Sequence, residues 1–319
     1  MVTDRAPRVL CIVGRPGWAH DLKTRALTAA LAGQYELVTR YQAEVNEDDI
    51  DEADLVLVYF WLQIEQLRRL KHAFRRVRDR LLIGACSEYE LERSWRRPGL
   101  AMLSSLPRAV FANNLALATR LEAELKRKVF YTPNGVDTNF FRPAPASIPN
   151  APLRFGWAGS LTNQTAGGHR GVHEIIVPAA GTVEGVELSL AAREQRWRNS
   201  DEMREFYHSL HVYVCASRSE GTPNPCLEAA ACGLAILTTR VGNMPEFIRD
   251  GENGLFFARD VEDLAPKLRR LRDDPELRMR LGRAARATAE AWDWRYQAPR
   301  YAEMFAEVLG ARASRSKPA

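Results

Sequence analysis

The sequence contains no long hydrophobic run. Its most apolar stretch, Leu55–Leu62, is about half the roughly 20 residues that a transmembrane helix requires. The apolar run Val9–Val13 lies close to arginines on both sides and is too short for a secretory signal. Internal repeats and low-complexity segments are also absent, which excludes collagen-like and coiled-coil chains. With 46% hydrophobic and 27% charged residues over 319 positions, the chain has the composition of a globular protein of about two domains.

Cysteine is scarce, and its pattern indicates neither a disulfide scaffold nor a zinc site. The five cysteines are an odd number, and all but one lie among hydrophobic or small residues. They are Cys11, Cys86, Cys215, Cys226 and Cys232. None belongs to a Cys/His cluster with the spacing of zinc ligands. We therefore expect reduced packing residues in a cytoplasmic protein.

Lysine is also rare, since only six of the 45 basic residues are lysines. The formal net charge of +5 and the isoelectric point of about 9.0 suit an anionic ligand, an anionic membrane surface or nucleic acid. The charge does not choose among these partners, and the arginine bias runs through the whole chain. We therefore give the charge little weight.

What the sequence does contain is a regular alternation of short apolar runs with helical patterns, which predicts parallel sheets joined by right-handed crossovers. A first series of strand-like runs is Arg8–Gly14, Glu36–Thr39, Asp54–Tyr59, Leu81–Cys86, Ala109–Ala112 and Val129–Thr132. A second series is Leu153–Ala158, Val186–Ala192, His211–Ala216, Ala235–Thr239 and Gly254–Phe257. The last predicted helices are Val261–Leu271, Pro275–Ala291 and Tyr296–Leu309. The predicted fold class is α/β, with two doubly wound parallel sheets.

The break between the two sheets is predicted at Arg142–Pro152, where four prolines make a stiff, extended linker. The expected organisation is a Rossmann-like domain over residues 1–142, a proline-rich linker over 143–152 and a second Rossmann-like domain over 153–292. A final helix over 293–310 and a polar tail over 311–319 complete the chain.

The most informative segment is Val212–Gly233, which predicts a strand, a polar loop and a helix of small residues. Asn224 suits the N-cap of that helix, Pro225 its first position, and Gly233 its end. The helix then begins at the carboxyl end of a parallel strand, where open α/β sheets bind ligands and where a helix dipole favours an anion.

Two carboxylates, Glu220 and Glu228, flank this predicted anion site. Acidic side chains are unexpected there unless they accept hydrogen bonds from hydroxyl groups. Sugars and riboses supply such hydroxyls. A capping charge at Glu228 and a solvated loop acid at Glu220 are the alternatives that the residues alone leave open.

The segment resembles the family-4 retaining glycosyltransferases, which have the GT-B architecture. The shared pattern is Glu, seven residues and Glu, followed by Ala-x-Ala-x-Gly, and it is found here as Glu220, Glu228 and Ala229–Gly233. Four further segments agree in order, namely Thr132–Asp137, Phe155–Gly159, Val241–Glu246 and Asp250–Phe257. The resemblance is strong over residues 131–257 and weak over the first 130. It implies two Rossmann-like domains facing across a cleft, with the acceptor on the first, the nucleotide-sugar donor on the second, and a last helix that crosses back.

The resemblance also implies roles for single residues. Glu228 would bind the nucleotide ribose, and Glu220 would hold hydroxyls of the donor sugar. The loop from Gly221 onward would offer backbone N–H groups to the sugar and the diphosphate. Because proline cannot donate, the expected donors are those of Thr222, Asn224 and Cys226.

Positive charge is needed beside a diphosphate leaving group. The family usually places two basic residues after the first strand of this domain, but the first matching position is Ser160. The second is Arg170, which we predict to clamp the phosphates, with a surface arginine as the alternative. Arg193, after the next strand, is a weaker candidate for the missing charge. The loop Leu161–Gly168 between these positions looks longer than usual.

In the first domain, the resemblance places Gly17 close to the phosphates and His20 near the donor or the acceptor. A solvent-facing histidine is the alternative for His20. Many members carry a histidine after the fourth strand, whereas this chain has Ser87 or Glu88 in that place. Asn134, in the matching segment before the linker, is a further candidate for the acceptor side. No base is assigned, because in this family the departing phosphate can take the acceptor's proton on the same face.

Three weaker signals have simpler interpretations. An apolar stripe from Ile64 to Val77 with a basic opposite face fits contact with anionic lipid, but a solvated helix face is the preferred interpretation. Asp49-x-Asp51 is a metal motif of another glycosyltransferase architecture, and a surface loop or helix is preferred here. Gly14-x-x-Gly17 is incomplete as a dinucleotide fingerprint.

The sequence thus predicts a retaining glycosyltransferase that needs no metal or other cofactor. Its predicted partners are a nucleotide diphosphate-sugar donor and a sugar, lipid or small-molecule acceptor, with peripheral contact at the inner face of the membrane left open and no nucleic acid. The alternatives are another GT-B enzyme, such as an epimerase or a phosphorylase, and a non-catalytic or partner-dependent subunit. The base, the sugar, the acceptor and the oligomeric state are not determined by the sequence.

Overall fold

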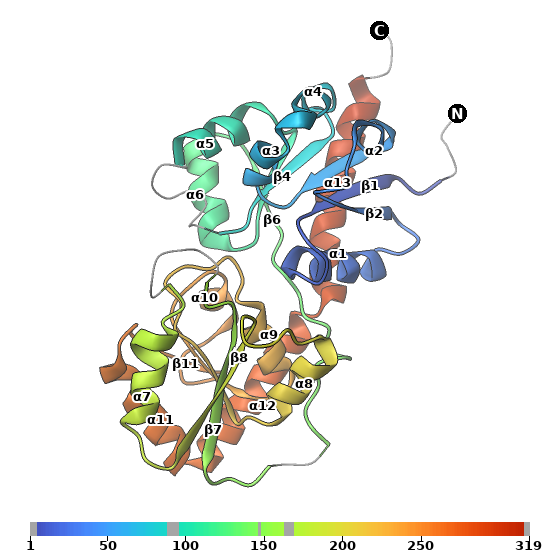
Figure 1. Cartoon of the computed structure of the whole chain (residues 1–319). Coiled ribbons are helices and arrows are strands. Elements are labelled where there is room, and N and C mark those ends of the chain that lie inside the picture. The colour runs from blue at the N-terminus through green and yellow to red at the C-terminus, as the bar shows by residue number, and fades with distance from the viewer. Residues whose placement is uncertain (1–4, 88–95, 146–147, 163–168, 316–319) are drawn as a thin grey trace. The chain divides into compact units, whose positions relative to one another are not determined.

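The computed structural model describes residues 5–87, 96–145, 148–162 and 169–315 (Figure 1). The chain forms two compact units. The first contains residues 1–134 together with 294–319, and the second contains residues 135–293. Each unit is built around one parallel sheet, as the alternating pattern predicts. No helix in the described parts of the chain is both long and apolar enough to cross a membrane.

The first unit has a six-stranded sheet in the order β2-β1-β3-β4-β5-β6, and every neighbouring pair is parallel. Its strands are β1 (Arg8–Val13), β2 (Glu36–Tyr41), β3 (Leu55–Val58), β4 (Leu81–Ala85), β5 (Ala109–Ala112) and β6 (Val129–Tyr131). Each lies within or overlaps a predicted strand. Strands β3, β4 and β5 are buried throughout, as expected for parallel strands covered on both faces.

Helices cover both faces of this sheet. They are α1 (Ala19–Ala30), α2 (Glu47–Glu52), α3 (Leu62–Gln66), the 3₁₀ turn η1 (Arg68–Leu70), α4 (Lys71–Arg76), α5 (Arg96–Ser105), α6 (Leu115–Leu125) and α13 (Trp294–Arg315). One face packs against α1 and α13, with Leu27, Tyr301 and Phe305 fully buried. The other packs against the helices from α2 to α6. Figure 1 shows α13, in red, beside the blue strands of the same unit.

The second unit has a five-stranded parallel sheet in the order β11-β10-β9-β7-β8. Its strands are β7 (Leu153–Gly159), β8 (Val186–Ala192), β9 (Val212–Cys215), β10 (Ala235–Thr238) and β11 (Leu255–Phe256). Its helices are the π-helical turn η4 (Val172–Ile176), α7 (Val177–Gly181), α8 (Ser200–His208), α9 (Asn224–Ala231), α10 (Met244–Phe247), α11 (Val261–Asp273) and α12 (Pro275–Ala291). The chain runs from β7 outward to β8 and then returns to β9 on the other side of β7. The carboxyl ends of β7 and β9 are therefore the topological switch point of this sheet.

Side-chain caps fix where several of these helices begin. Asn199 and Glu202 form a reciprocal capping box at the start of α8. The side chain of Asp260 accepts from the Asp263 amide at the start of α11, and Asp274 plays the same part for α12. The predicted helices of this region are therefore found within one or two residues of their expected limits.

The units do not divide at the proline-rich linker. Residues 135–142, which the sequence assigned to the first domain, pack within the second unit. The Val136 amide donates to the carbonyl of Trp292 at 3.1 Å, and Asp293 accepts from the amide of Thr138 at 3.1 Å and from its hydroxyl at 2.5 Å. Phe141 lies edge-to-face with Tyr207. The proline-rich stretch thus connects two parts of the second unit, and α13 continues to Arg315, into the predicted polar tail.

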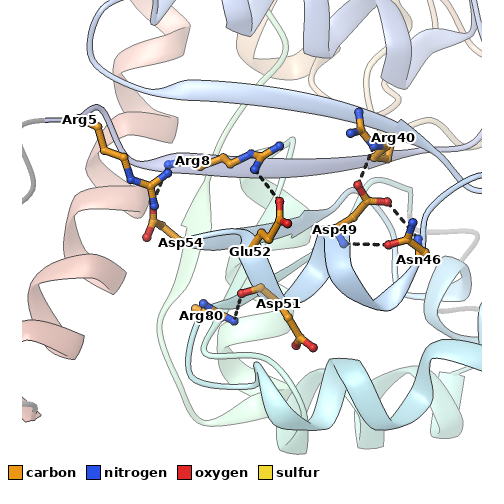
Figure 2. Close-up of polar contacts among 9 residues, drawn as sticks. All are labelled: Arg5, Arg8, Arg40, Asn46, Asp49, Asp51, Glu52, Asp54 and Arg80. Carbon is orange, nitrogen blue, oxygen red and sulfur yellow. Dashed lines mark hydrogen bonds and ion pairs between the residues drawn. The ribbon is translucent and has the colours of Figure 1, made fainter.

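The acidic run before β3 is occupied by caps and ion pairs (Figure 2). Asn46 and Asp49 form a capping box at the start of α2, and Asp49 also accepts from Arg40 at 2.7 Å. The Asp51 carboxylate pairs with Arg76 at 2.7 Å, while its carbonyl accepts from Arg80. The preferred interpretation of Asp49-x-Asp51 as part of a surface helix agrees with this arrangement.

Close packing of α12 against the turn between α9 and β10 requires a glycine at position 282. A Cβ atom there would lie 2.2 Å from the carbonyl oxygen of Gly233. We expect Gly282→Ala to lower the free energy of unfolding by about 2 kcal/mol, because an overpacked contact forces the backbone apart. Gly181→Ala is the matched control, since a Cβ atom at this helical position meets nothing within 4 Å. Urea unfolding compares the two, and equal midpoints for both variants would contradict the contact.

Candidate active site

The carboxyl edge of the second sheet brings together Arg170 and Glu220. The Arg170 guanidinium and the Glu220 carboxylate form an ion pair, and their side chains are 21% and 11% exposed. The hydroxyl of Ser217 donates to the same carboxylate oxygen at 2.8 Å. Burial lowers the pKa of the Arg170 guanidinium. The two residues that the sequence predicted to act on the diphosphate and on the sugar therefore bind each other in this structure.

Backbone geometry places Arg170 against the end of β9. Gly171 has a φ of +67°, and a Cβ atom on it would lie 2.6 Å from the carbonyl oxygen of Ala216. The carbonyl of His169 accepts from the amide of Arg218 at 2.9 Å. A glycine is thus needed directly after Arg170, because this segment approaches the strand end too closely for a side chain.

The loop after β10 supports the loop that carries Glu220. The Thr239 hydroxyl donates to the carbonyl of Ser217 at 2.7 Å, and the backbone N–H of Asn243 donates to the carbonyl of Gly221 at 3.1 Å. Gly242 has a φ of +51°, and a Cβ atom there would lie 2.3 Å from the same Gly221 oxygen. The position of Glu220 is therefore set by two neighbouring loops.

Several buried polar atoms around this loop make no hydrogen bond with a described residue. They are the hydroxyls of Ser219 and Thr222, both polar atoms of the Asn243 side chain, and Nε of Arg170. Buried polar groups are normally paired, so such a cluster indicates a place where ligand or solvent completes the bonding. Sequence reasoning assigned no role to Ser217, Ser219 or Asn243. The available signals were their positions beside Glu220 and in the segment Val241–Glu246.

Helix α9 begins one residue earlier than predicted, with Pro223 rather than Asn224 at its N-cap. The backbone N–H of Asn224 donates to the carbonyl of Thr222 at 2.9 Å, and the backbone N–H of Cys226 donates to the carbonyl of Pro223 at 2.8 Å. Two of the three predicted backbone donors are therefore already used within the turn. The amide of Thr222 makes no hydrogen bond with a described residue.

Glu228 lies on α9, one turn from its start, and accepts a hydrogen bond from a tyrosine. The Tyr207 hydroxyl, on α8, donates to Oε2 of Glu228 at 2.6 Å. Burial raises the pKa of the Glu228 carboxyl, and the hydrogen bond from Tyr207 opposes that rise. Tyr207 itself is fully buried. Sequence reasoning missed this partner because it lies 21 residues away on another helix.

Arg193 and Ser160, the two weaker candidates for contact with the diphosphate, lie near the end of β7 in different surroundings. The Arg193 amide donates to the carbonyl of Gly159 at 2.9 Å, and its guanidinium lies 4.9 Å from the centre of the Trp197 ring. Burial lowers the pKa of Arg193, and the nearby charge of Arg170 lowers it further, against the effect of Glu194. The charges of Arg193 and Arg170 are therefore close enough to affect each other.

Ser160, at the position where a basic residue was expected, is hydrogen-bonded to Glu194. Its hydroxyl donates to Glu194 at 2.5 Å, and this carboxylate also accepts from the amides of Leu161 and Thr162 and from the Thr162 hydroxyl. Partial burial would raise the pKa of Glu194, but these hydrogen bonds bring it down from 4.5 to about 2. The carboxylate is therefore ionised at neutral pH. Most of the loop predicted to be long, residues 163–168, lies outside the described residues.

The first-unit candidates lie at the carboxyl edge of their own sheet. Gly17 follows β1 with a φ of +70°, and its amide donates to Asp21 at 2.7 Å. The His20 ring stacks on Tyr59, with 4.9 Å between ring centres. Ser87 and Asn134, which are 8% and 7% exposed, follow β4 and β6 respectively. Glu88 lies outside the described residues.

His20 is a neutral histidine at physiological pH. Burial lowers its pKa from 6.5 to about 3, and the positive charge of Lys23 acts in the same direction. A neutral imidazole can donate one hydrogen bond and accept another. The His20 ring is half-buried and stacked on Tyr59.

No group of three or more His, Cys, Asp or Glu side chains in the described parts of the chain is placed to hold a metal ion.

Comparisons with known proteins give the class of this fold. A sucrose-phosphate synthase from Thermosynechococcus elongatus superposes with a TM-score of 0.74, covering 96% of this chain and 100% of that one at 16% identity. HepE from Anabaena, in complex with UDP and glucose, superposes with a TM-score of 0.73, covering 93% and 99% at 16% identity. The two parallel-sheet units are therefore those of the GT-B glycosyltransferase fold.

Sequence comparisons also match this chain to glycosyltransferases. Residues 194–288 match the family model of the group 1 glycosyl transferases. A D-inositol 3-phosphate glycosyltransferase from Streptomyces bingchenggensis is 34% identical over 159 residues, which are 44% of this chain and 35% of the relative. The sulfoquinovosyl transferase SQD2 of Arabidopsis thaliana is 40% identical over 99 residues, which are 30% and 19%. These matches span about a third or less of the curated relatives' length, and they support a glycosyltransferase of group 1.

Proposed function

We propose that this chain is a retaining glycosyltransferase of family 4, which moves a sugar from a nucleoside diphosphate donor to a hydroxyl acceptor without a metal ion. The observation that carries the proposal is the Arg170–Glu220 pair at the switch point of the second sheet. Glu228 lies one helical turn into the neighbouring helix, and the matched segment 194–288 contains both carboxylates. Arg170 opposes the charge of the diphosphate, Glu220 accepts from sugar hydroxyls, and Glu228 accepts from the ribose.

In the proposed reaction, the bond between the anomeric carbon and the phosphate oxygen breaks, and the diphosphate departs with the electron pair. The acceptor oxygen bonds to the anomeric carbon on the same face. Its proton passes to the departing phosphate, which becomes the nucleoside diphosphate product. Arg170, with Arg193 close by, stabilises the charge that develops on the leaving group.

On the acceptor side, we propose that the first unit binds the hydroxyl substrate at the carboxyl edge of its sheet. Neutral His20, together with Ser87 and Asn134, would line that edge, and Gly17 would allow a close backbone approach. A sugar, a lipid and a small molecule all present the required hydroxyl. The five free cysteines support a cytoplasmic location for this reaction.

A second candidate function has one specific observation in its favour. Glu194 places an ionised carboxylate beside Ser160, where a leaving group would be helped by a cation. This arrangement is consistent with a non-catalytic or partner-dependent subunit that binds nucleotide. Glu220→Ala distinguishes the two functions, because a transferase would lose turnover whereas a scaffold would support its partner unchanged.

The proposal is tested by the melting temperature of the chain with a panel of nucleoside diphosphates and their sugars. A ligand that binds the native state raises the melting temperature by mass action. We expect a rise with one nucleotide and the loss of that rise in Glu228→Ala. The exposed Glu174 on η4 provides the control variant Glu174→Ala, which should keep the full shift. A folded chain that no nucleotide stabilises would overturn the transferase assignment.

A further inference from the structure

Two of the five free cysteines lie in contact at the base of the loop that carries Glu220. Cys215 is the last residue of β9, and Cys226 is the third residue of α9. The Cys226 thiol contacts both the Cys215 sulfur and the Thr238 side chain. Thr238, on β10, is the register partner of Cys215, so one helix residue covers two neighbouring strand ends. We call residues 216–225, which lie between the two cysteines, the Glu220 loop.

The two thiols differ in acidity, and the difference assigns a role to each. A hydrogen bond from Cys226 lowers the pKa of the Cys215 thiol against the effect of burial, and the backbone N–H of Ser217 and the charge of Arg170 act in the same direction. Burial raises the pKa of the Cys226 thiol, and its bond to Cys215 raises it further. Cys215 is therefore the nucleophilic sulfur of the pair, and Cys226 keeps its proton.

Cys215 is connected to the candidate active site through one residue. Its thiol donates to the hydroxyl oxygen of Ser217 at 3.6 Å, and that hydroxyl donates to Oε1 of Glu220 at 2.8 Å. Glu220 in turn pairs with Arg170. The helix that carries the second sulfur also carries Glu228. A change at the pair of sulfurs therefore acts on both carboxylates of the site.

Cys232 provides a comparison within the same helix. It lies at the other end of α9, about 9 Å from Cys226 along the helix axis, which is too far for a disulfide. Burial raises the pKa of its thiol to about 12, so the sulfur stays protonated at neutral pH. Cys232 thus has the burial of the pair without its geometry.

We propose that Cys215 and Cys226 form a reversible disulfide when the chain meets a small hydroperoxide, and that this bond weakens donor binding by changing the Glu220 loop. The effect on donor binding rests on the proposed function, whereas formation of the disulfide does not. Because both sulfurs are buried, the oxidant has to be as small as hydrogen peroxide.

The reaction has two steps. In the first, the Cys215 thiolate attacks one oxygen of hydrogen peroxide, and the O–O bond breaks. Hydroxide leaves with the electron pair and becomes water by taking up the proton that Cys215 has lost, while Cys215 becomes a sulfenic acid. In the second, the Cys226 sulfur displaces the hydroxyl group, which leaves with the Cys226 proton as a second water. Both sulfurs are oxidised, the peroxide is reduced, and a thiol reductant reverses the change.

The disulfide would change the geometry of the Glu220 loop. Bonded sulfurs lie about 2 Å apart, which is closer than any non-bonded contact, so the start of α9 is drawn toward the end of β9. Cys215 also loses the proton that it donates to Ser217. We expect nucleoside diphosphate to bind about tenfold more weakly to the oxidised chain, within the usual range of coupling between two sites.

The test compares the reduced full chain with the same chain treated with hydrogen peroxide. After alkylation of free thiols, a peptide map should show one linked pair of peptides that contains Cys215 and Cys226. The nucleoside diphosphate that stabilises the reduced chain should raise the melting temperature of the oxidised chain less, and a thiol reductant should restore the full rise. Cys232→Ser, the control on α9, should form the same disulfide. Cys215→Ser should form none, and peroxide should leave its nucleotide shift unchanged.

Three results would overturn the proposal. One is a folded, peroxide-treated wild-type chain without the linked peptides. Another is a product that joins Cys232 to either sulfur, or an irreversible sulfinic acid at Cys215. The third is an unchanged nucleotide shift in the fully linked chain, which would show that the pair is not coupled to the donor site. A reduced chain that no nucleotide stabilises would overturn the transferase assignment instead, and the peptide map would still decide for or against the disulfide.

Discussion

Glu220→Gln should abolish sugar transfer and yet increase the stabilisation that a nucleoside diphosphate gives to the chain. Loss of a carboxylate that accepts from sugar hydroxyls should lower turnover by roughly 100-fold or more. The same change removes the partner of Arg170, which is mostly buried and already holds Glu220 in the free chain. The unliganded variant should therefore melt at a lower temperature, because a buried guanidinium is left unpaired.

A nucleoside diphosphate would supply the missing negative charge. Its phosphates would not have to displace the Glu220 carboxylate or lie beside it, so the rise in melting temperature should exceed that of the wild type. Turnover assays and thermal shifts measured on the same samples test both halves. Glu174→Gln, at an exposed position on η4, removes one negative charge nearby and should change neither quantity. An equal or smaller nucleotide shift in Glu220→Gln would show that the pair does not oppose nucleotide binding.

Nucleoside binding should become stronger as the pH rises through the pKa of Glu228. Burial raises this pKa above its ordinary value of 4.5, and only the ionised carboxylate accepts from both ribose hydroxyls. Affinity should therefore rise by up to about tenfold per pH unit below that pKa and level off above it. The stability of the chain without nucleoside depends on pH in the opposite direction. The contribution of Glu228 is fully present below its ordinary pKa and is lost as the pH rises through the raised one.

Two variants isolate this carboxyl group. Glu228→Gln should bind weakly and without the pH dependence. Tyr207→Phe removes the hydrogen bond that opposes the rise in pKa, so its midpoint should move to higher pH. Calorimetry with a nucleoside that lacks phosphates measures the effect, because phosphate ionisation then adds no term. A Glu228→Gln profile identical to that of the wild type would place the titrating group elsewhere.

The strands of this chain could be predicted from the sequence because each is a short apolar run between helical patterns. Runs such as Leu81–Cys86 and Val186–Ala192 leave little choice of structure, and each contains or coincides with a strand. The division into units was harder to predict. Prolines mark a stiff segment, but the boundary depends on long-range bonds such as those from Thr138 to Asp293, 155 residues away. Local patterning carries no information about such contacts.

In the candidate site, the two carboxylates could be predicted from the sequence, but the residues that contact them could not. The spacing of Glu220 and Glu228 singled out both carboxylates, since their loop and helix are contiguous in the sequence. Their partners could not be found in this way, because Tyr207 reaches Glu228 from another helix and Asn243 supports the Glu220 loop from another strand connection. The backbone donors of Asn224 and Cys226 were assigned from residue type alone, and the tight turn uses both internally.

The last helix of the chain completes the first unit, so we expect the second unit to fold first although most of the first is synthesised earlier. The strands of the first unit leave the ribosome first, but α13, which buries Val9, Leu57 and Phe111 on one face of their sheet, leaves after the whole second unit. The second unit can therefore complete its core while the first still exposes an apolar sheet face. A chain truncated after Asp293 and released from the ribosome should contain a protease-resistant second unit beside an unfinished first one. Domains made earlier usually fold earlier, and we expect the reverse order for this chain.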